Sequence, residues 1–192
     1  MDQEEIYNRI SDHHFSTVLE KASARGYASI IYDVICRPAI QSRLSARDLG
    51  DTLERAAMFQ RPNVIKVILM ENSALTRIDY RAVESAVYYA SLNDGIDSLQ
   101  MLLANEIITE KLSQKSIVSK LSQVSFNSYA DVVELYLGNP KVIEKIPKDR
   151  LKILLRKAQK SNARTSIRDS LKRALYGERM MPLYKSFFKK II

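Results

Sequence analysis

Apolar residues recur along this chain at a fixed interval of 34 residues. The register is set by Leu19, Leu53, Val87, Leu121 and Leu155, with no insertion or deletion between them. Six more columns keep the same period, at 13, 9 and 4 residues before and at 3, 12 and 16 residues after each of these positions, and all 35 positions are apolar. Only 46% of the whole chain is hydrophobic, so composition alone does not produce the pattern. A constant period of this length predicts a stack of like units that bury one continuous core between them.

The spacing within each unit predicts two helices. The columns at −4, 0 and +3 fall on one helical face, and the columns at +12 and +16 fall on a second. The position eight residues before the register mostly holds helix N-cap types: Ser11, Ser45, Asp79, Ser113 and Pro147. Ser45 and Asp48 form a capping-box pattern, and Pro62 suits the first turn of a second helix. Each unit is thus predicted to be a helix, a tight turn, a second helix and a short connector.

The 192 residues are therefore predicted to form a single repeat domain. The expected repeats span about residues 5–38, 39–72, 73–106, 107–140 and 141–175. Tyr176, Arg179 and Met180 keep the register, so we expect residues 176–192 to be a partial sixth repeat or a C-terminal cap.

Within each unit the apolar residues follow one order: a Leu, a small pair, a turn and two further apolar pairs. The second unit has Leu53, Ala56, Ala57, Gln60, Val64, Ile65, Ile68 and Leu69. In this order the chain resembles a degenerate ankyrin array over nearly its whole length, which implies an all-α solenoid of stacked helix-turn-helix repeats. The usual ankyrin unit is one residue shorter, its Thr-Pro-Leu-His tetrad is missing here, and the segments between repeats contain no Gly. We therefore expect short connectors without pronounced β-hairpin fingers. A tetratricopeptide-like solenoid shares the 34-residue period and is the alternative fold.

Positions that hold similar residues in every unit are expected to pack between units, whereas positions that differ between units are available for contacts with a partner. The variable positions of the first helix lie one, two, five and six residues after the register, away from its core stripe. The ankyrin resemblance implies that this helix lines a concave surface. In the middle three units the candidate protein-binding residues are Met58, Phe59, Tyr88, Tyr89, Leu92 and Phe126. Aromatic and Met enrichment is typical of interface cores. The alternative is that some of them, Tyr89 and Leu92 above all, pack against neighbouring repeats.

One recurring column is cationic. Ten residues before the register stand Arg9, Arg43, Arg77, Lys111 and Lys145, and Arg179 continues the column. These side chains form either a basic ladder that binds an acidic strip or a set of stack residues that neutralise the carbonyl end of the second helix. Their uniformity favours the stack residues.

The net charge of +8 comes from the last fifth of the chain. Residues 151–192 contain 12 Lys and Arg against 2 Asp and Glu, whereas residues 1–150 contain 18 against 20. The candidate basic patch consists of Arg156, Lys157, Lys160, Arg164, Arg168 and Lys172. Solvation of a capping unit explains part of this charge. The rest indicates an acidic partner, and binding of nucleic acid or anionic lipid through residues 151–192 is the alternative function.

Signals for an enzyme are weak. The chain has one Cys and two His, and it lacks a Gly-rich phosphate loop, a Gly-x-Ser-x-Gly elbow and an HExxH motif. A Cys36–His13 or Cys36–His14 pair has no third orienting group. We therefore expect a non-catalytic protein–protein interaction module or scaffold without metal or cofactor, which binds another protein of unspecified identity. No apolar run reaches the roughly 18 residues of a membrane span. The expected location is the cytoplasm, or a host cell's cytoplasm in the case of a secreted effector.

Overall fold

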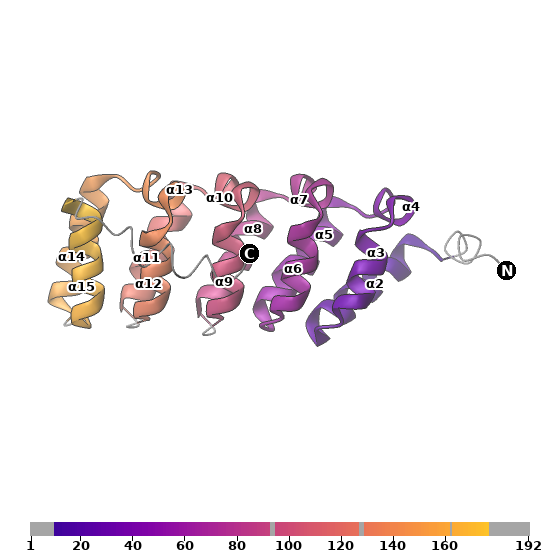
Figure 1. The fold of residues 1–192 in the computed structure, drawn as a ribbon, viewed down its shortest axis with the longest axis horizontal. Coiled ribbons are helices and arrows are strands. Elements are labelled where there is room, and N and C mark those ends of the chain that lie inside the picture. The colour runs from indigo at the N-terminus through magenta and orange to yellow at the C-terminus, as the bar shows by residue number, and fades with distance from the viewer. Residues whose placement is uncertain (1–9, 93–94, 127–128, 162, 177–192) are drawn as a thin grey trace. The chain divides into compact units, whose positions relative to one another are not determined.

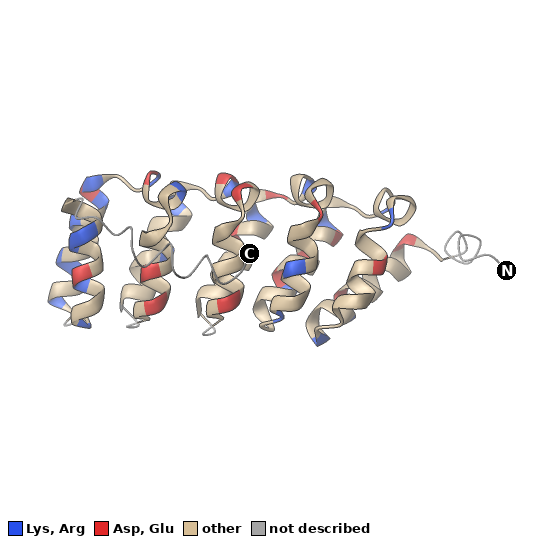
Figure 2. Cartoon of the chain, in the orientation of Figure 1, with Lys and Arg blue, Asp and Glu red and all other residues tan. Residues whose placement is uncertain are grey.

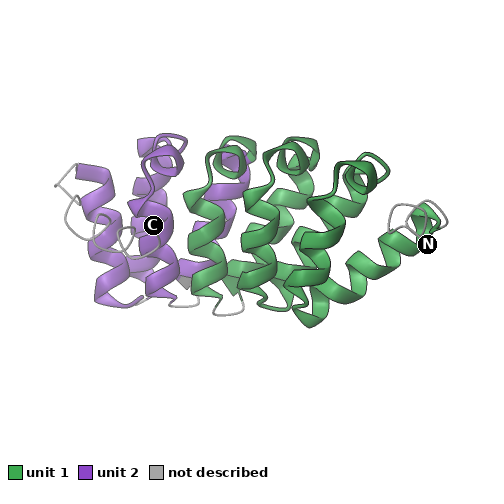
Figure 3. Ribbon diagram, turned by 45° about the vertical axis from the view of Figure 1, so that its right-hand side comes forward, with its two compact units in different colours: residues 1–111 green, residues 112–192 purple. Residues whose placement is uncertain are grey.

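The computed structural model describes residues 10–92, 95–126, 129–161 and 163–176. These residues form α-helices joined by short turns, and none of them is in a strand (Figure 1). The chain divides into two compact units, Met1–Lys111 and Leu112–Ile192, which are called unit 1 and unit 2 below (Figure 3). The expected all-α class is confirmed.

Five first helices begin at intervals of 34 residues. They are α2 (Asp12–Arg25), α5 (Ala46–Met58), α8 (Tyr80–Leu92), α11 (Gln114–Phe126) and α14 (Lys148–Lys160). The capping box predicted for Ser45 and Asp48 is confirmed: the Asp48 backbone N–H donates to Ser45 Oγ at 3.1 Å, and the Ser45 backbone N–H donates to the Asp48 carboxylate at 2.8 Å. Ser113 caps α11 in the same way, since its Oγ accepts from the Ser116 backbone N–H at 3.1 Å.

A second helix follows each first helix. The second helices are α3 (Ala28–Ile35), α6 (Pro62–Met70), α9 (Ile96–Ala104), α12 (Ala130–Gly138) and α15 (Thr165–Tyr176). Pro62 opens α6 as predicted, because its missing N–H and fixed φ suit the first helical position. Gly26 and Gln60 have φ values of 82° and 54° and occupy the same place in the turn between the two helices.

The connectors differ from the expectation, because they contain a third, short helix. These helices are α4 (Pro38–Gln41), α7 (Asn72–Arg77), α10 (Glu106–Lys111) and α13 (Pro140–Ile143). Pro38 and Pro140 stand at first helical positions, and the Asn139 side chain accepts from the Val142 backbone N–H at 3.2 Å. Each of the first four units is thus a helical hairpin followed by one turn of helix or a little more.

The periodic apolar columns form the core. Of their 34 positions among the described residues, 32 are buried, and Ile10 and Leu69 are half-buried. The residues that recur every 34 positions are therefore the residues that form the interior.

In unit 1 the hairpins pack against one another in sequence order. The first helix α5 contacts α2 and α8, and the second helix α6 contacts α3 and α9 (Figures 1 and 3). Gly50 allows the close approach of α5 and α8, because a Cβ at this position would stand 2.8 Å from the Cβ of Ala82. Arg55 of α5 also pairs with Glu20 of α2 at 2.8 Å.

Unit 2 repeats this arrangement with two hairpins. The first helix α11 contacts α12 and α14, and α15 contacts both α12 and α14. Polar contacts also join the two second helices. The carboxylate of Glu134 in α12 accepts a hydrogen bond from Ser170 Oγ of α15 at 3.3 Å and lies 3.8 Å from the Arg173 guanidinium of α15.

The cationic column serves the stack. Each of its described members donates to the carbonyl oxygen of the residue 33 positions earlier: Arg43 to Ile10, Arg77 to Leu44, Lys111 to Ile78, and Lys145 to Leu112. The expected neutralisation of carbonyl groups is therefore present. Its location was predicted wrongly, since the acceptors lie before the next first helix and not at the end of the second helix.

Candidate protein-binding surfaces

Five of the six candidate protein-binding residues lie in unit 1, towards the C-terminal ends of two adjacent first helices. We call them the apolar strip: Met58, Phe59, Tyr88, Tyr89 and Leu92. Phe59 ends α5 and is 43% exposed, and the other four are half-buried. Tyr89 and Leu92, the strongest candidates for packing residues, are thus only partly covered. The side chain of Phe126 lies outside the described ones, so a continuation of the strip there stays a prediction.

The two tyrosines of the apolar strip touch each other. The ring centroids of Tyr88 and Tyr89 are 5.5 Å apart and their planes are inclined by 57°. A tilted pair at this distance is a favourable aromatic contact. It holds two large rings together on α8, where each remains partly exposed.

Charged groups of α5 border the apolar strip. Burial raises the pKa of the Glu54 carboxyl and the nearby Asp51 carboxylate raises it further, while Arg55 and a hydrogen bond with Ser85 oppose the change. This carboxyl therefore belongs to the contact between α5 and α8.

The structure divides the candidate basic patch between two helices (Figure 2). Arg156 and Lys160 are exposed on α14 and share a face through their four-residue spacing. Arg164 is exposed in the turn before α15. On α15, Arg168 donates to Thr165 Oγ1 at 3.1 Å, and the Lys172 ammonium lies 3.4 Å from the Asp169 carboxylate. Lys157 differs from the other five, because it lines a groove that they do not line.

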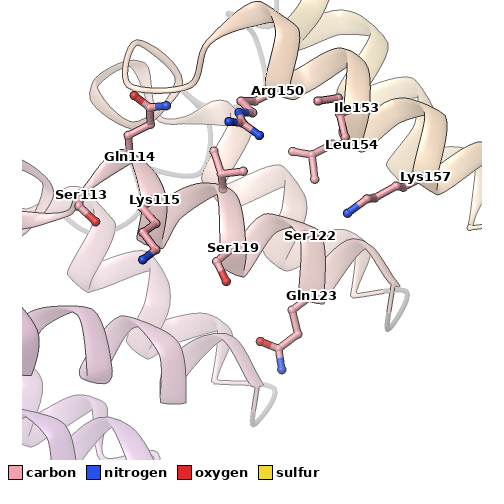
Figure 4. A pocket seen from close by; sticks show the side chains of 11 residues that line it. Ser113, Gln114, Lys115, Ser119, Ser122, Gln123, Arg150, Ile153, Leu154 and Lys157 are labelled. Atoms are coloured by element: carbon pink, nitrogen blue, oxygen red, sulfur yellow. The ribbon is translucent and has the colours of Figure 1, made fainter.

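That groove lies between α11 and α14 in unit 2 and has a volume of about 900 Å³ (Figure 4). We call it the α11–α14 groove. It is lined by Ser113, Gln114, Lys115, Val118, Ser119, Ser122, Gln123, Arg150, Ile153, Leu154 and Lys157. Its volume falls within the range of about 300–1,000 Å³ usual for ligand clefts.

Sequence reasoning missed the groove, although the sequence contains one signal for it. Two residues before the register, the first four units have Thr17, Asp51, Ser85 and Ser119. The fifth unit has Ile153, which is 40% exposed. Ile153 is thus the one apolar member of an otherwise polar column, and it lines the groove.

The arrangement around Cys36 does not favour thiol chemistry. Burial raises the pKa of the Cys36 thiol, and the carboxylates of Glu71 and Asp33 raise it further. The reactive form of cysteine is the thiolate, so this environment suppresses the nucleophile. His14 is engaged at the start of α2, where its Nδ1 lies 2.5 Å from Ser11 Oγ.

The described residues contain no group of three or more His, Cys, Asp or Glu side chains placed to hold a metal ion. In the same residues, every helix is too short or too polar to traverse a bilayer. Comparison of the chain with protein-family models, with curated proteins and with solved structures finds no match.

Proposed function

We propose that this chain is a non-catalytic protein-binding module, built as an ankyrin-like solenoid, which binds a partner protein across its first helices. The 34-residue period of the core and the equal spacing of the first helices support the solenoid. The suppressed thiolate of Cys36 argues against a cysteine nucleophile.

The observation that carries the binding proposal is the partial exposure of the apolar strip on α5 and α8. Aromatic side chains such as Phe and Tyr are enriched at the cores of protein interfaces, where a few residues supply most of the binding energy. Two packed helices present them in fixed positions, so little conformational entropy is lost on binding.

The proposal is tested with the full chain as bait. Partners are selected by proximity labelling in cells, and the affinity of each purified candidate is then measured for the wild type and for Phe59→Ala combined with Tyr88→Ala. We expect the double variant to bind at least tenfold more weakly, which corresponds to about 1.4 kcal/mol.

The matched control is Met70→Ala at the end of α6, where the side chain is 68% exposed and outside the apolar strip. This variant should bind like the wild type. Circular dichroism confirms that each variant is folded. Undiminished binding by a folded Phe59→Ala, Tyr88→Ala variant would exclude the apolar strip as the binding surface.

A further inference from the structure

We infer that the α11–α14 groove binds an acidic peptide segment that carries apolar side chains and belongs to a partner protein. The inference rests on the proposed function and adds to it the chemical class of the partner segment. It depends on residues of unit 2 alone, and so it is separate from the apolar strip of unit 1.

The charge of the groove selects an acidic segment. Lys115, Arg150 and Lys157 line it, and none of its eleven described lining residues is Asp or Glu. The Asp149 carboxylate lies 3.8 Å from Arg150 Nε, and both side chains are more than half exposed. Such an exposed pair is weak. A partner carboxylate that is partly desolvated in the groove can therefore compete for Arg150.

The floor of the groove selects apolar side chains. Val118 of α11 lines the groove, and Ile153 and Leu154 of α14 lie between Arg150 and Lys157 (Figure 4). Ile153 is 40% exposed, and covering its remaining apolar surface favours binding. An amphipathic peptide supplies this contact through its own apolar side chains.

The polar residues of the groove suit a peptide backbone. Ser119, Ser122 and Gln123 provide hydroxyl and amide groups that both donate and accept hydrogen bonds. None of the described lining residues is aromatic. Single-stranded nucleic acid is usually held by aromatic stacking together with cations, so the groove lacks half of that combination.

The sequence excludes this chain's own C-terminal segment as a well-matched occupant. Residues 177–192 contain Arg179, Lys185, Lys189 and Lys190 against the single acid Glu178. A segment with that charge is repelled by three groove cations. The complementary occupant is acidic, unlike residues 177–192.

The test uses the full chain and a synthetic array of twelve-residue peptides. One set combines Asp or Glu with Leu, Ile or Phe; a second set has Lys in place of the acids; a third has Ser in place of the apolar residues. Binding of labelled peptides is measured by fluorescence anisotropy. We expect the first set to contain binders, and we expect the charge-reversed and Ser-substituted counterparts of the best binder to bind at least tenfold more weakly.

Two charge reversals on the same helix locate the site. Arg150→Glu with Lys157→Glu alters the groove, whereas Lys152→Glu with Arg156→Glu changes the net charge equally at exposed positions that do not line it. We expect the first pair to weaken peptide binding at least tenfold and the second to change it less than threefold. Ile153→Ser should also weaken binding at least fivefold, with little change in its dependence on salt.

Several results would overturn the inference. These are an array in which acidic-apolar peptides bind no better than their counterparts, and equal losses from the two charge reversals. Parallel measurements with a 20-nucleotide polyuridine and with phosphatidylserine vesicles identify the source of such general anion binding. Tight binding to either probe that the Lys152→Glu, Arg156→Glu variant loses would assign the basic patch to nucleic acid or lipid instead.

Failure of this inference is distinguishable from failure of the proposed function. Phe59→Ala with Tyr88→Ala should leave binding of the acidic peptide unchanged, because those residues lie in unit 1. If this variant loses the partner protein while groove variants do not, the proposed function stands and the inference falls. If groove variants alone lose the partner, the groove is the binding site and the apolar strip is not.

Discussion

The Lys111 ammonium donates a hydrogen bond of 3.0 Å to the carbonyl oxygen of Leu75, in the last turn of α7. It also donates to the carbonyl oxygens of Thr76, at 2.9 Å, and Ile78. Burial lowers the pKa of Lys111, and the Asp79 carboxylate opposes that change. The ammonium thus loses part of its hydration, and the three carbonyl groups at the end of α7 and just after it take the place of the lost water.

Substitution Lys111→Met should destabilise the protein by about 1–3 kcal/mol, because Met keeps the apolar stem but leaves three carbonyl groups without their charged donor. The measurement is the midpoint of urea unfolding. Lys66→Met on α6, where the side chain is exposed, should change the stability by less than about 0.5 kcal/mol. Equal effects of the two substitutions would show that the carbonyl contacts contribute nothing.

Substitution Gly50→Ala should destabilise the protein by about 1–3 kcal/mol, because the new methyl group would stand 2.8 Å from the Cβ of Ala82. The second substitution Ala82→Gly removes that clash. In a double-mutant cycle followed by thermal unfolding, we expect the pair to be more stable than the sum of the single effects predicts. Simple additivity would mean that α5 and α8 separate without cost.

Substitution Gly26→Ala should cost about 1–2 kcal/mol, since the residue has φ = 82° and L-residues other than Gly avoid that region. The added Cβ would also lie 2.9 Å from Arg61 Cδ, in a side chain whose Nε donates to the Ala24 carbonyl at 2.9 Å. Gly26→Asn should cost less, because Asn tolerates the left-handed conformation. Urea unfolding of both variants checks this order.

Acid should weaken the start of α5 through Asp48. Burial alone would raise the pKa of this carboxyl, but hydrogen bonds from the Ser45 side chain, the Ser16 side chain and the Ser45 backbone outweigh it and lower the pKa. A lowered folded-state pKa gives stability that is present above the unfolded-state value of about 3.9 and is lost as pH falls through the folded value.

The wild type should therefore lose stability below about pH 4 more steeply than Asp48→Asn does. The measurement is the urea midpoint at a series of pH values between 6 and 2.5. Ser45→Ala removes one of the hydrogen bonds and should therefore also reduce the loss of stability below about pH 4. The effects of Ser45→Ala and Asp48→Asn should not be additive. If the urea midpoints of the wild type and of Asp48→Asn fall equally steeply with decreasing pH, this assignment is wrong.

The core and the helix starts were predictable from sequence because both depend on local rules. A buried column must be apolar in every unit, and so Leu19 and its counterparts at 34-residue intervals show the interior directly. The Ser45–Asp48 capping box and Pro62 are determined by backbone groups within a few residues.

The short helices were not predicted, because they are too short to show a helical period. A segment such as Pro38–Gln41 makes about one turn, which is too short for an amphipathic pattern to distinguish it from a loop. The carbonyl acceptors of the cationic column were predicted at the wrong place for the same reason. Arg77 and Lys111 bond to carbonyl groups at the ends of α4 and α7 and just beyond them, and those helices were absent from the prediction.

The candidate sites were only partly predictable, since exposure depends on how neighbouring helices pack. Spacing placed Tyr88 and Tyr89 on the outer side of α8, but packing decides that both are half-buried. The α11–α14 groove depends on the separation of two helices, which no residue pattern encodes. Only the isolated Ile153 pointed to it.

The cationic bridges give the stack a direction. Every described bridge runs from a later residue back to an earlier carbonyl group, as in the pairs Arg77–Leu44 and Lys145–Leu112. Shortening such a chain from its end exposes carbonyl groups that water can solvate cheaply. Shortening it from its beginning leaves a cation without its carbonyl acceptor, so the two trimmed proteins should differ in solubility and in susceptibility to proteases even when they lose the same number of hairpins.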